Sequence, residues 1–414
     1  MTPDPASAPA RTWSRRRVLQ AGAGALTGAG LGWSAAAVAL PVEDSTDRTD
    51  RTPGALPGAR VVEFHGPHQA GVSTPPPAHL SLLGLDLRRG VGAAGLARLM
   101  RLLSDDAARL TRGRPALADT EPELAFTPAA LTVTFGFGPR IFDEILGGAV
   151  DGAKPLPPFA TDALEKQWRQ TDLAVQICAD DPTTVAHARR MLLKDATGLA
   201  RPRWIQNGFR DAYGMRPDGT TMRNLMGQVD GTANPAATDP DFAELVWSRR
   251  PGLTGGTFLV LRRIRVELET WDQVDRAGRE AAVGRRLDNG APLTGRDEHD
   301  VPDFAATDAL GLPVIDPASH IARARSANPA QRFLRRGYNY CVPDPSRPTG
   351  EDSGLVFVAF AADVERQFVP VQRRLAELDR LNQWITTIGS AVYAVPPGCA
   401  EGEFVGQALL GMRR

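Results

Sequence analysis

The sequence predicts an α+β protein made of two similar units. In both halves of the chain, apolar runs with strand character alternate with segments of helical periodicity. The run Asp172–Asp180 resembles the run Gly354–Asp363, because each is apolar, ends in Ala-Asp and enters a predicted helix. A repeat of this kind indicates an internal duplication. The chain of 414 residues is also longer than a single core usually requires.

The N-terminus predicts an export signal. Residues 14–20, Ser-Arg-Arg-Arg-Val-Leu-Gln, form a twin-arginine pattern, and a weakly apolar run follows up to the Ala-Val-Ala of residues 37–39. A membrane anchor is the alternative, but the run is rich in Gly and Ala and is interrupted by Thr27 and Ser34. We therefore expect residues 1–39 to be a signal peptide read by the twin-arginine translocase. The mature protein would be periplasmic or extracellular. This route carries folded proteins, often with a cofactor already inserted.

The first unit is predicted over residues 60–215, after a polar, flexible lead-in at 40–59. Its expected strands cover 80–87, 131–138, 172–181 and 204–209, and its expected helices cover 95–110 and 182–193. His65 and His68 flank a Gly-Pro turn, which favours a surface or hydrogen-bonding role over a metal pair. Cys178 is expected in the core.

The second unit is predicted over residues 216–414, after a turn-rich boundary near 212–222. It contains expected strands at 256–266 and 354–363, a helix through Trp271, and a helix over 368–381. Without residues 1–39 the chain has 44 basic and 47 acidic residues, which does not suggest a nucleic-acid-binding surface. Three widely spaced cysteines imply neither a disulfide framework nor a cysteine metal cluster.

Three segments of the second unit could carry chemistry. The loop Gly227–Pro235 holds Asp230 between glycines, His320 follows Asp-Pro-Ala-Ser, and a pair of arginines precedes Gly337. An Asp-Gly pair alone is most often a turn, and a lone histidine is most often a surface or core residue. Together in an exported chain, they fit a haem peroxidase, which needs an imidazole on iron and an acid–base group with a cation opposite.

The chain resembles the dye-decolorizing peroxidases, and within them the exported bacterial branch that includes deferrochelatase/peroxidase proteins. The resemblance covers most of residues 60–400. The motifs that carry it are Gly227–Pro235, Gly255–Thr257, Arg262–Arg265, Gly290–Gly295, Ser319–Ile321, Arg335–Tyr340, Glu365–Pro370, Phe64–Gly71 and Leu131–Gly136. It implies two ferredoxin-like units, with antiparallel sheets covered by helices and haem b held by the C-terminal unit.

The resemblance also implies roles for individual residues. His320 would be the proximal iron ligand, Asp230 the distal acid–base and Arg336 the distal cation, with Arg335 as the alternative. Gly231 would border the cofactor. The family often has an arginine two residues after the ligand, where this chain has Ala322, so Arg323 or Arg325 would contact a haem propionate. Asp379 would accept the second imidazole N–H, or would be an exposed helix carboxylate.

The function implied is a peroxidase that uses hydrogen peroxide to oxidise bulky phenolic or dye-like donors. The alternatives are a haem-handling protein that releases iron, with secondary peroxidase activity, and a binding module without catalysis. Because the distal pocket would be too tight for a large dye, electrons would travel through an aromatic side chain. The candidates for this relay are Tyr338, Tyr340, Trp271 and Trp384. A homo-oligomer is left open.

Overall fold

The computed structural model describes residues 56–148, 151–217 and 219–411. The predicted signal peptide and residues 40–55 of the predicted lead-in lie outside the described residues. The end of the lead-in differs from the expectation of flexibility. Pro57–Ala59 forms a short 3-10 helix, and the carbonyl of Gly58 accepts a hydrogen bond from the N–H of Ala129 at 2.8 Å. This segment is therefore fixed to the first unit.

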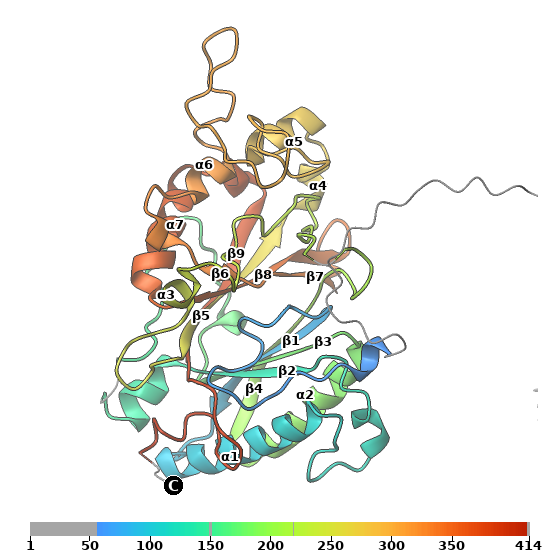
Figure 1. Ribbon diagram of the computed structural model, residues 1–414, viewed down its shortest axis with the longest axis vertical. Coiled ribbons are helices and arrows are strands. Elements are labelled where there is room, and N and C mark those ends of the chain that lie inside the picture. Colours follow the sequence, from blue (N-terminus) through green and yellow to red (C-terminus); the bar gives the residue numbers. More distant parts are fainter. Residues whose placement is uncertain (1–55, 149–150, 218, 412–414) are drawn as a thin grey trace, which may run out of the picture. The chain divides into compact units, whose positions relative to one another are not determined.

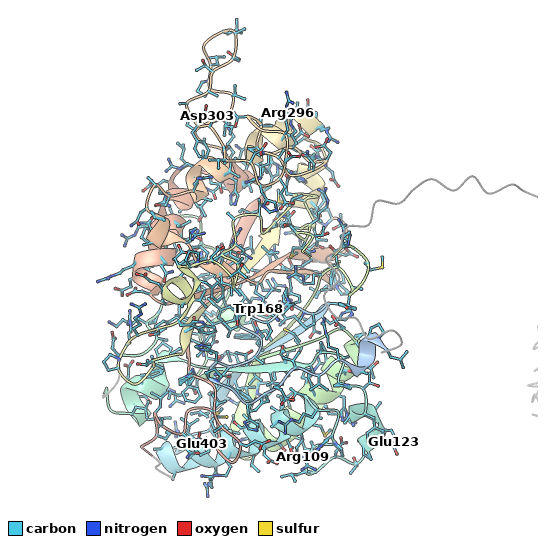
Figure 2. All side chains as sticks on the ribbon, viewed as in Figure 1. Arg109, Glu123, Trp168, Arg296, Asp303 and Glu403 are labelled. Atoms are coloured by element: carbon cyan, nitrogen blue, oxygen red, sulfur yellow. The ribbon has the colours of Figure 1, made fainter. Side chains whose placement is uncertain are left out.

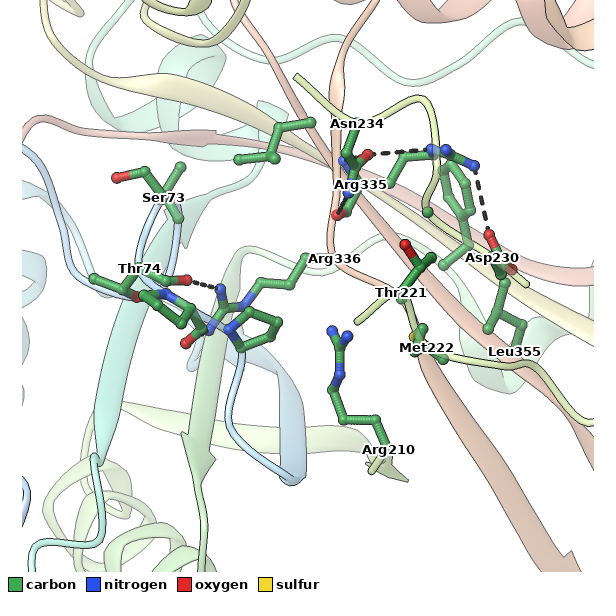
Figure 3. A pocket seen from close by; sticks show the side chains of 17 residues that line it. Ser73, Thr74, Arg210, Thr221, Met222, Asp230, Asn234, Arg335, Arg336 and Leu355 are labelled. Carbon is green, nitrogen blue, oxygen red and sulfur yellow. Dashed lines mark hydrogen bonds and ion pairs between the residues drawn. The ribbon is translucent and has the colours of Figure 1, made fainter. Parts of the chain in front are cut away.

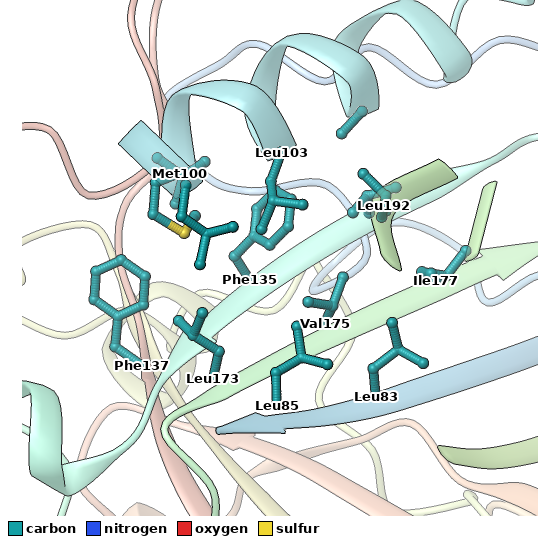
Figure 4. Packing of buried hydrophobic residues seen from close by; sticks show 14 of the residues in the cluster. Leu83, Leu85, Met100, Leu103, Phe135, Phe137, Leu173, Val175, Ile177 and Leu192 are labelled. Atoms are coloured by element: carbon teal, nitrogen blue, oxygen red, sulfur yellow. The ribbon is translucent and has the colours of Figure 1, made fainter. Parts of the chain in front are cut away.

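The first unit contains a four-stranded antiparallel sheet in the order β4-β1-β3-β2 (Figure 1). Helices α1 and α2 pack on one face of this sheet, where leucine, phenylalanine and valine side chains form a core (Figure 4). The elements are β1 (His79–Leu87), α1 (Ala93–Leu110), β2 (Thr132–Phe137), β3 (Leu173–Ala179), α2 (Pro182–Ala196) and β4 (Ala200–Phe209).

The second unit repeats this topology, with its strands in the order β9-β5-β8-β7. Helix α7 covers the outer face of the sheet, and the two-residue strand β6 pairs with β8. The elements are α3 (Phe242–Val246), β5 (Thr257–Val266), α4 (Leu268–Trp271), α5 (Arg276–Val283), α6 (His320–Ala324), β6 (Leu334–Arg335), β7 (Tyr338–Pro343), β8 (Glu351–Ala361), α7 (Val364–Leu378) and β9 (Ile385–Val395). The expected α+β fold of duplicated ferredoxin-like units is confirmed.

The repeat that was visible in the sequence occupies equivalent places in the two units. β3 and β8 are the third strand of their units, and each leads into a helix capped by an aspartate. The Asp181 side chain accepts from the N–H of Thr184 at the start of α2, and the Asp363 side chain accepts from the N–H of Arg366 at the start of α7. A carboxylate at this position satisfies an N–H that the helix leaves free.

The inner faces of the two sheets pack against each other. Their shared core contains Leu82 and Cys178 from the first unit and Val358, Phe360 and Tyr393 from the second. At the sheet edges, Phe137 pairs with Ala394 and Phe209 pairs with Asn339, so the strands continue from one unit into the other. Cys178 is fully buried, as expected.

Trp168 belongs to the first unit and lies near the junction of the two (Figure 2). Its ring is 6.2 Å from that of Trp204 and 4.4 Å from the guanidinium of Arg263 in the second unit. Arg263 is itself buried and bonds Asp352 at 2.8 Å. The junction is therefore a packed and hydrogen-bonded interior.

The long connection between α5 and α6 projects from the second unit and carries Arg296 and Asp303 near one end of the view (Figure 2). It returns to the sheet at His320, the first residue of α6. Strands β7 and β9, like the short β6, were not expected from the sequence, although β9 contains the β-branched run typical of a strand. Within the described residues, no helix is long and apolar enough to cross a membrane.

Candidate active site

Asp230 lies on an irregular loop, as the sequence predicts. The loop is closed by an isolated bridge between Arg223 and Val229, and by a hydrogen bond from the Asp230 N–H to the carbonyl of Met222 at 2.8 Å. Gly231 has φ +142°, a conformation that other residues rarely adopt. The side-chain amide of Asn224 donates to Oδ2 of Asp230 at 3.3 Å. The carboxylate therefore has a defined position.

The cation that contacts Asp230 is Arg335. Nη1 of Arg335 lies 3.5 Å from Oδ1 of Asp230, and about a quarter of each side chain is exposed. Asn234 fixes this arginine, because its side-chain amide donates to the Arg335 carbonyl at 2.7 Å and its Oδ1 accepts the Arg335 N–H at 2.9 Å. Asn234 belongs to the motif Gly227–Pro235, but the sequence did not indicate this bond.

Arg336, the residue expected to be the distal cation with Arg335 as the alternative, lines the same cavity but does not contact Asp230. Its Nη1 donates to the carbonyl of Thr74 and its Nη2 lies 3.5 Å from the carbonyl of Pro75, both in the first unit. The residue is only 3% exposed. Neighbouring residues of an extended chain project to opposite sides, so only one of the two arginines can reach Asp230. Arg335 is the one that contacts Asp230.

His320 is paired with Asp379. Nδ1 of the imidazole lies 2.6 Å from Oδ2 of Asp379, which also accepts from the N–H of Leu381 through Oδ1 at 3.0 Å. Asp379 is 4% exposed and ends α7, so it is not an exposed helix carboxylate. The bond holds the proton on Nδ1 and leaves the lone pair of Nε2 available to a metal.

The electrostatics connect this histidine with the Asp230–Arg335 pair. Burial opposes a charged imidazole, but the carboxylate of Asp379 outweighs it and raises the pKa of His320. Asp230 also raises the pKa of His320 and Arg335 lowers it. The imidazole therefore lies within electrostatic range of both residues.

Arg323 and Arg325, the two arginines expected near a haem propionate, lie in different surroundings. Arg323 donates to the carbonyl of Arg374 at 3.1 Å and to Glu377 at 3.0 Å, so it is engaged with α7. Arg325 is exposed, and its positive charge repels that of Arg285. Arg285 is buried and donates to the carbonyl of Gly290 at 2.6 Å. Burial lowers the pKa of Arg285, as does repulsion from Arg335 and Arg325.

A cavity of about 260 Å³ lies beside the Asp230–Arg335 pair (Figure 3). Both units line it: residues 72–76 and Arg210 come from the first, and the Asp230 loop and residues 334–337 come from the second. Leu334, Leu355 and Phe357 supply apolar wall and are partly exposed. The sequence did not indicate that the first unit contributes to this space.

These residues fit a haem group. Among the described residues, no cluster of three or more His, Cys, Asp or Glu side chains could hold a bare metal ion. An iron that is already coordinated by a porphyrin needs only one protein ligand, and Nε2 of His320 can provide it because the hydrogen bond to Asp379 uses Nδ1. Leu334 and Phe357 are apolar and partly exposed beside the Asp230–Arg335 pair and suit contact with a flat macrocycle, and arginine side chains suit its propionates.

Comparisons with known proteins identify the family. The model of the Dyp-type peroxidase N-terminal domain matches residues 69–210, and that of the C-terminal domain matches residues 221–400. The chain belongs to the Dyp-type peroxidase family.

Relatives with names and solved structures agree over nearly the full length. The chain is 37% identical to the dye-decolorizing peroxidase of Thermobifida fusca, covering 97% of this chain and 98% of the relative. It is 34% identical to a deferrochelatase of Escherichia coli over 96% and 97%. It also resembles the crystal structure of a DyP-type peroxidase from Cellulomonas bogoriensis, with 53% identity, a TM-score of 0.82 and coverage of 86% of this chain and 99% of that one. Ferric DtpA from Streptomyces lividans shows 39% identity and a TM-score of 0.82, over 86% and 98%.

Proposed function

We propose that this peroxidase reacts with hydrogen peroxide at a haem ligated by His320, with Asp230 as the acid–base and Arg335 as the cation. Peroxidase activity and a haem cofactor accompany membership of the family. The donors we propose are bulky phenolic or dye-like molecules, in keeping with the name of the Thermobifida fusca relative.

When bound, haem would supply a redox-active iron that accepts two oxidising equivalents from peroxide and passes them to donors. Asp230 accepts the proton of the incoming peroxide and returns it to the oxygen that leaves as water. Arg335 stabilises the negative charge that develops as the O–O bond breaks. Asp379 holds the imidazole of His320 in one orientation and strengthens its basicity.

The observations that carry this proposal are the contact between Asp230 and Arg335 and the hydrogen bond between His320 and Asp379 in the same unit. Stopped-flow mixing of the haem-loaded protein with peroxide tests it. Asp230→Asn is nearly isosteric but cannot accept a proton, so it should slow the reaction by about 10²–10⁴-fold while haem is retained. Asp272→Asn, at an exposed carboxylate, is the matched control. If Asp230→Asn reacted as fast as the parent from pH 3 to pH 8, Asp230 would be removed from this role.

Export by the twin-arginine route remains part of the proposal, with a periplasmic or extracellular mature protein. It is supported by the Ser-Arg-Arg-Arg pattern and the Ala-Val-Ala site. Changing Arg15 and Arg16 together to Lys should leave unprocessed precursor inside the cell, as measured by fractionation and mass spectrometry. Normal accumulation of the processed form outside would point to the general secretory route.

A haem-handling function is the second candidate, favoured by the 34% identity to proteins named deferrochelatase. Incubation of haem-loaded protein without peroxide distinguishes the two. Release of iron with an intact porphyrin would support this function, whereas rapid saturable oxidation of a dye with peroxide and no iron release supports the peroxidase alone.

A further inference from the structure

The cavity beside Asp230 contains more positive charge than the peroxidase chemistry uses. Its lining includes three arginines, Arg210, Arg335 and Arg336, and a single carboxylate, Asp230. Arg335 is paired with that carboxylate. Arg210 and Arg336 line the same space, and neither forms an ion pair with Asp230, which acts on Arg210 only as a more distant charge.

Arg336 is buried and incompletely bonded. Its two terminal nitrogens donate to the backbone carbonyls of Thr74 and Pro75, which are neutral, and its Nε has no hydrogen-bond partner. A buried N–H without a partner costs free energy, and a buried charge without a counter-ion costs more. The fold therefore keeps an unsatisfied cation at the wall of this cavity.

Arg210 directs its guanidinium into the cavity, between Arg336 and the loop of Thr221 and Met222 (Figure 3). It stands 5.8 Å from the ring centre of Tyr338. Within the described part of the chain, this guanidinium forms no hydrogen bond or ion pair. Burial lowers the pKa of Arg210, and the positive charge of Arg336 lowers it further, against the opposing charges of Asp211 and Asp230. An anion bound between the two arginines would supply a closer counter-charge and so offset both effects.

The remaining lining is apolar and the space is small. Val72, Pro75, Pro76 and Met222 present carbon to the cavity on the side of Arg210 and Arg336. A volume of about 260 Å³ lies below the ~300–1,000 Å³ of pockets that hold drug-sized ligands. A single aromatic ring is therefore the size that suits it, and a large dye is not.

We propose that Arg210 and Arg336 bind the carboxylate of a small aromatic acid, whose ring occupies the apolar part of this cavity. Guanidinium groups recognise carboxylates through paired, charge-assisted N–H···O bonds. Resting on the proposed peroxidase function, a phenol that carries a carboxylate would be a donor oxidised within the cavity. Two such phenols each lose one electron and one proton, and together they reduce one hydrogen peroxide to two waters.

Titration of the haem-loaded protein with benzoate in the absence of peroxide tests the site directly, by calorimetry and by the haem absorbance. Benzamide is the uncharged comparison, and inorganic phosphate is the anion without a ring. Benzoate should bind once per chain and at least about tenfold more tightly than either, because only benzoate satisfies both the arginines and the apolar wall. Phosphate binding as tight as benzoate binding would overturn the aromatic part of the proposal.

Arg210→Gln should weaken benzoate binding about tenfold and remove the preference over benzamide, and Arg210→Lys should restore part of both. Arg201→Gln, at an exposed arginine of strand β4, which ends one residue before Arg210, is the matched control. During turnover, the ratio of the KM values for 4-hydroxybenzoate and 4-hydroxybenzamide should move towards one in the Gln variant. If Arg210→Gln bound benzoate as tightly as the parent, the proposed binding site would be contradicted. The same holds if this variant lost haem but kept the parental affinity for benzoate. If the protein bound benzoate but did not react with peroxide, the peroxidase proposal would be contradicted and the binding site would stand.

Discussion

Nδ1 of His320 lies 2.6 Å from Oδ2 of Asp379, although 59 residues separate them in the sequence. The bond joins the first residue of α6 to the end of α7, so two helices must be correctly placed for it to form. It makes the imidazole a better electron donor to a metal, because the carboxylate draws the Nδ1 proton towards itself.

Asp379→Asn should weaken haem retention by about 10–100-fold, because an amide supports the imidazole less strongly than a carboxylate does. The rate of haem transfer to an excess of apomyoglobin measures this. His320→Ala should fail to take up haem with a normal Soret band, whereas His65→Ala, whose imidazole lies 3.7 Å from the sulfur of Cys399, should behave as the parent. A parental transfer rate in Asp379→Asn would show that the hydrogen bond does not affect the iron ligand.

Replacing Arg335 by Leu should affect the reaction with peroxide, whereas replacing Arg336 by Leu should affect the stability of the fold. Loss of Arg335 should slow the reaction with peroxide by about 10²–10³-fold, because it removes a cation aimed at developing charge. Loss of Arg336 should lower the free energy of unfolding by about 1–3 kcal/mol, since the carbonyl of Thr74 loses its donor. Stopped-flow kinetics and thermal unfolding measure the two effects. If Arg336→Leu were the slower variant with peroxide, the distal cation would be Arg336 after all.

The structure narrows the proposed electron relay to the pair Trp271 and Trp384. Tyr338, Tyr340 and Trp271 are at most 1% exposed, whereas Trp384 is partly exposed and lies 5.0 Å from Trp271 between ring centres. Trp384→Phe should therefore lower turnover of bulky dyes several-fold, measured under steady-state conditions. Tyr213→Phe, an exposed aromatic of the first unit, is the control. Unchanged dye turnover in Trp384→Phe would exclude this path.

The carboxyl group of Asp195 should make the free energy of unfolding depend on pH, independently of the active site. Burial and the neighbouring carboxylate of Asp106 raise the pKa of Asp195 to about 7, and its Oδ2 has no hydrogen-bond partner. An ordinary aspartate titrates near pH 4, so the folded protein holds a proton that the unfolded chain releases between about pH 4 and pH 7. The free energy of unfolding should fall as the pH rises through this range and level off above it.

Asp195→Asn should remove that fall and stabilise the protein at pH 8 by about 1–2 kcal/mol, a figure reduced for solvent screening of the partly exposed side chain. At pH 4 the variant and the parent should differ little. Urea unfolding at the two pH values measures this, with Asp143→Asn, an exposed residue, as the control. Equal stabilisation at both values would show that Asp195 is not protonated in the folded protein.

The role proposed for His320 follows from the resemblance of the chain to its family. Local patterns in the sequence determined the repeated α+β units and the irregular loop around Asp230. Each depends on the periodicity or turn chemistry of a short segment, which is readable without the rest of the chain. For Asp379 the sequence left two alternatives open, a partner of the His320 imidazole and an exposed helix carboxylate, because sequence does not show how deeply a residue at a helix end is buried. Strand β9 was missed, although its residues favour a strand.

The tertiary structure decided which of Arg335 and Arg336 contacts Asp230. A shift of one residue along an extended segment turns a side chain to the opposite side, and pairing of β6 with β8 is what fixes that position. The same applies to Arg210 and residues 72–76, which reach the cavity only because the inner faces of the two sheets pack together. No local pattern encodes these contacts, since they join residues from separate units that only the complete fold brings together.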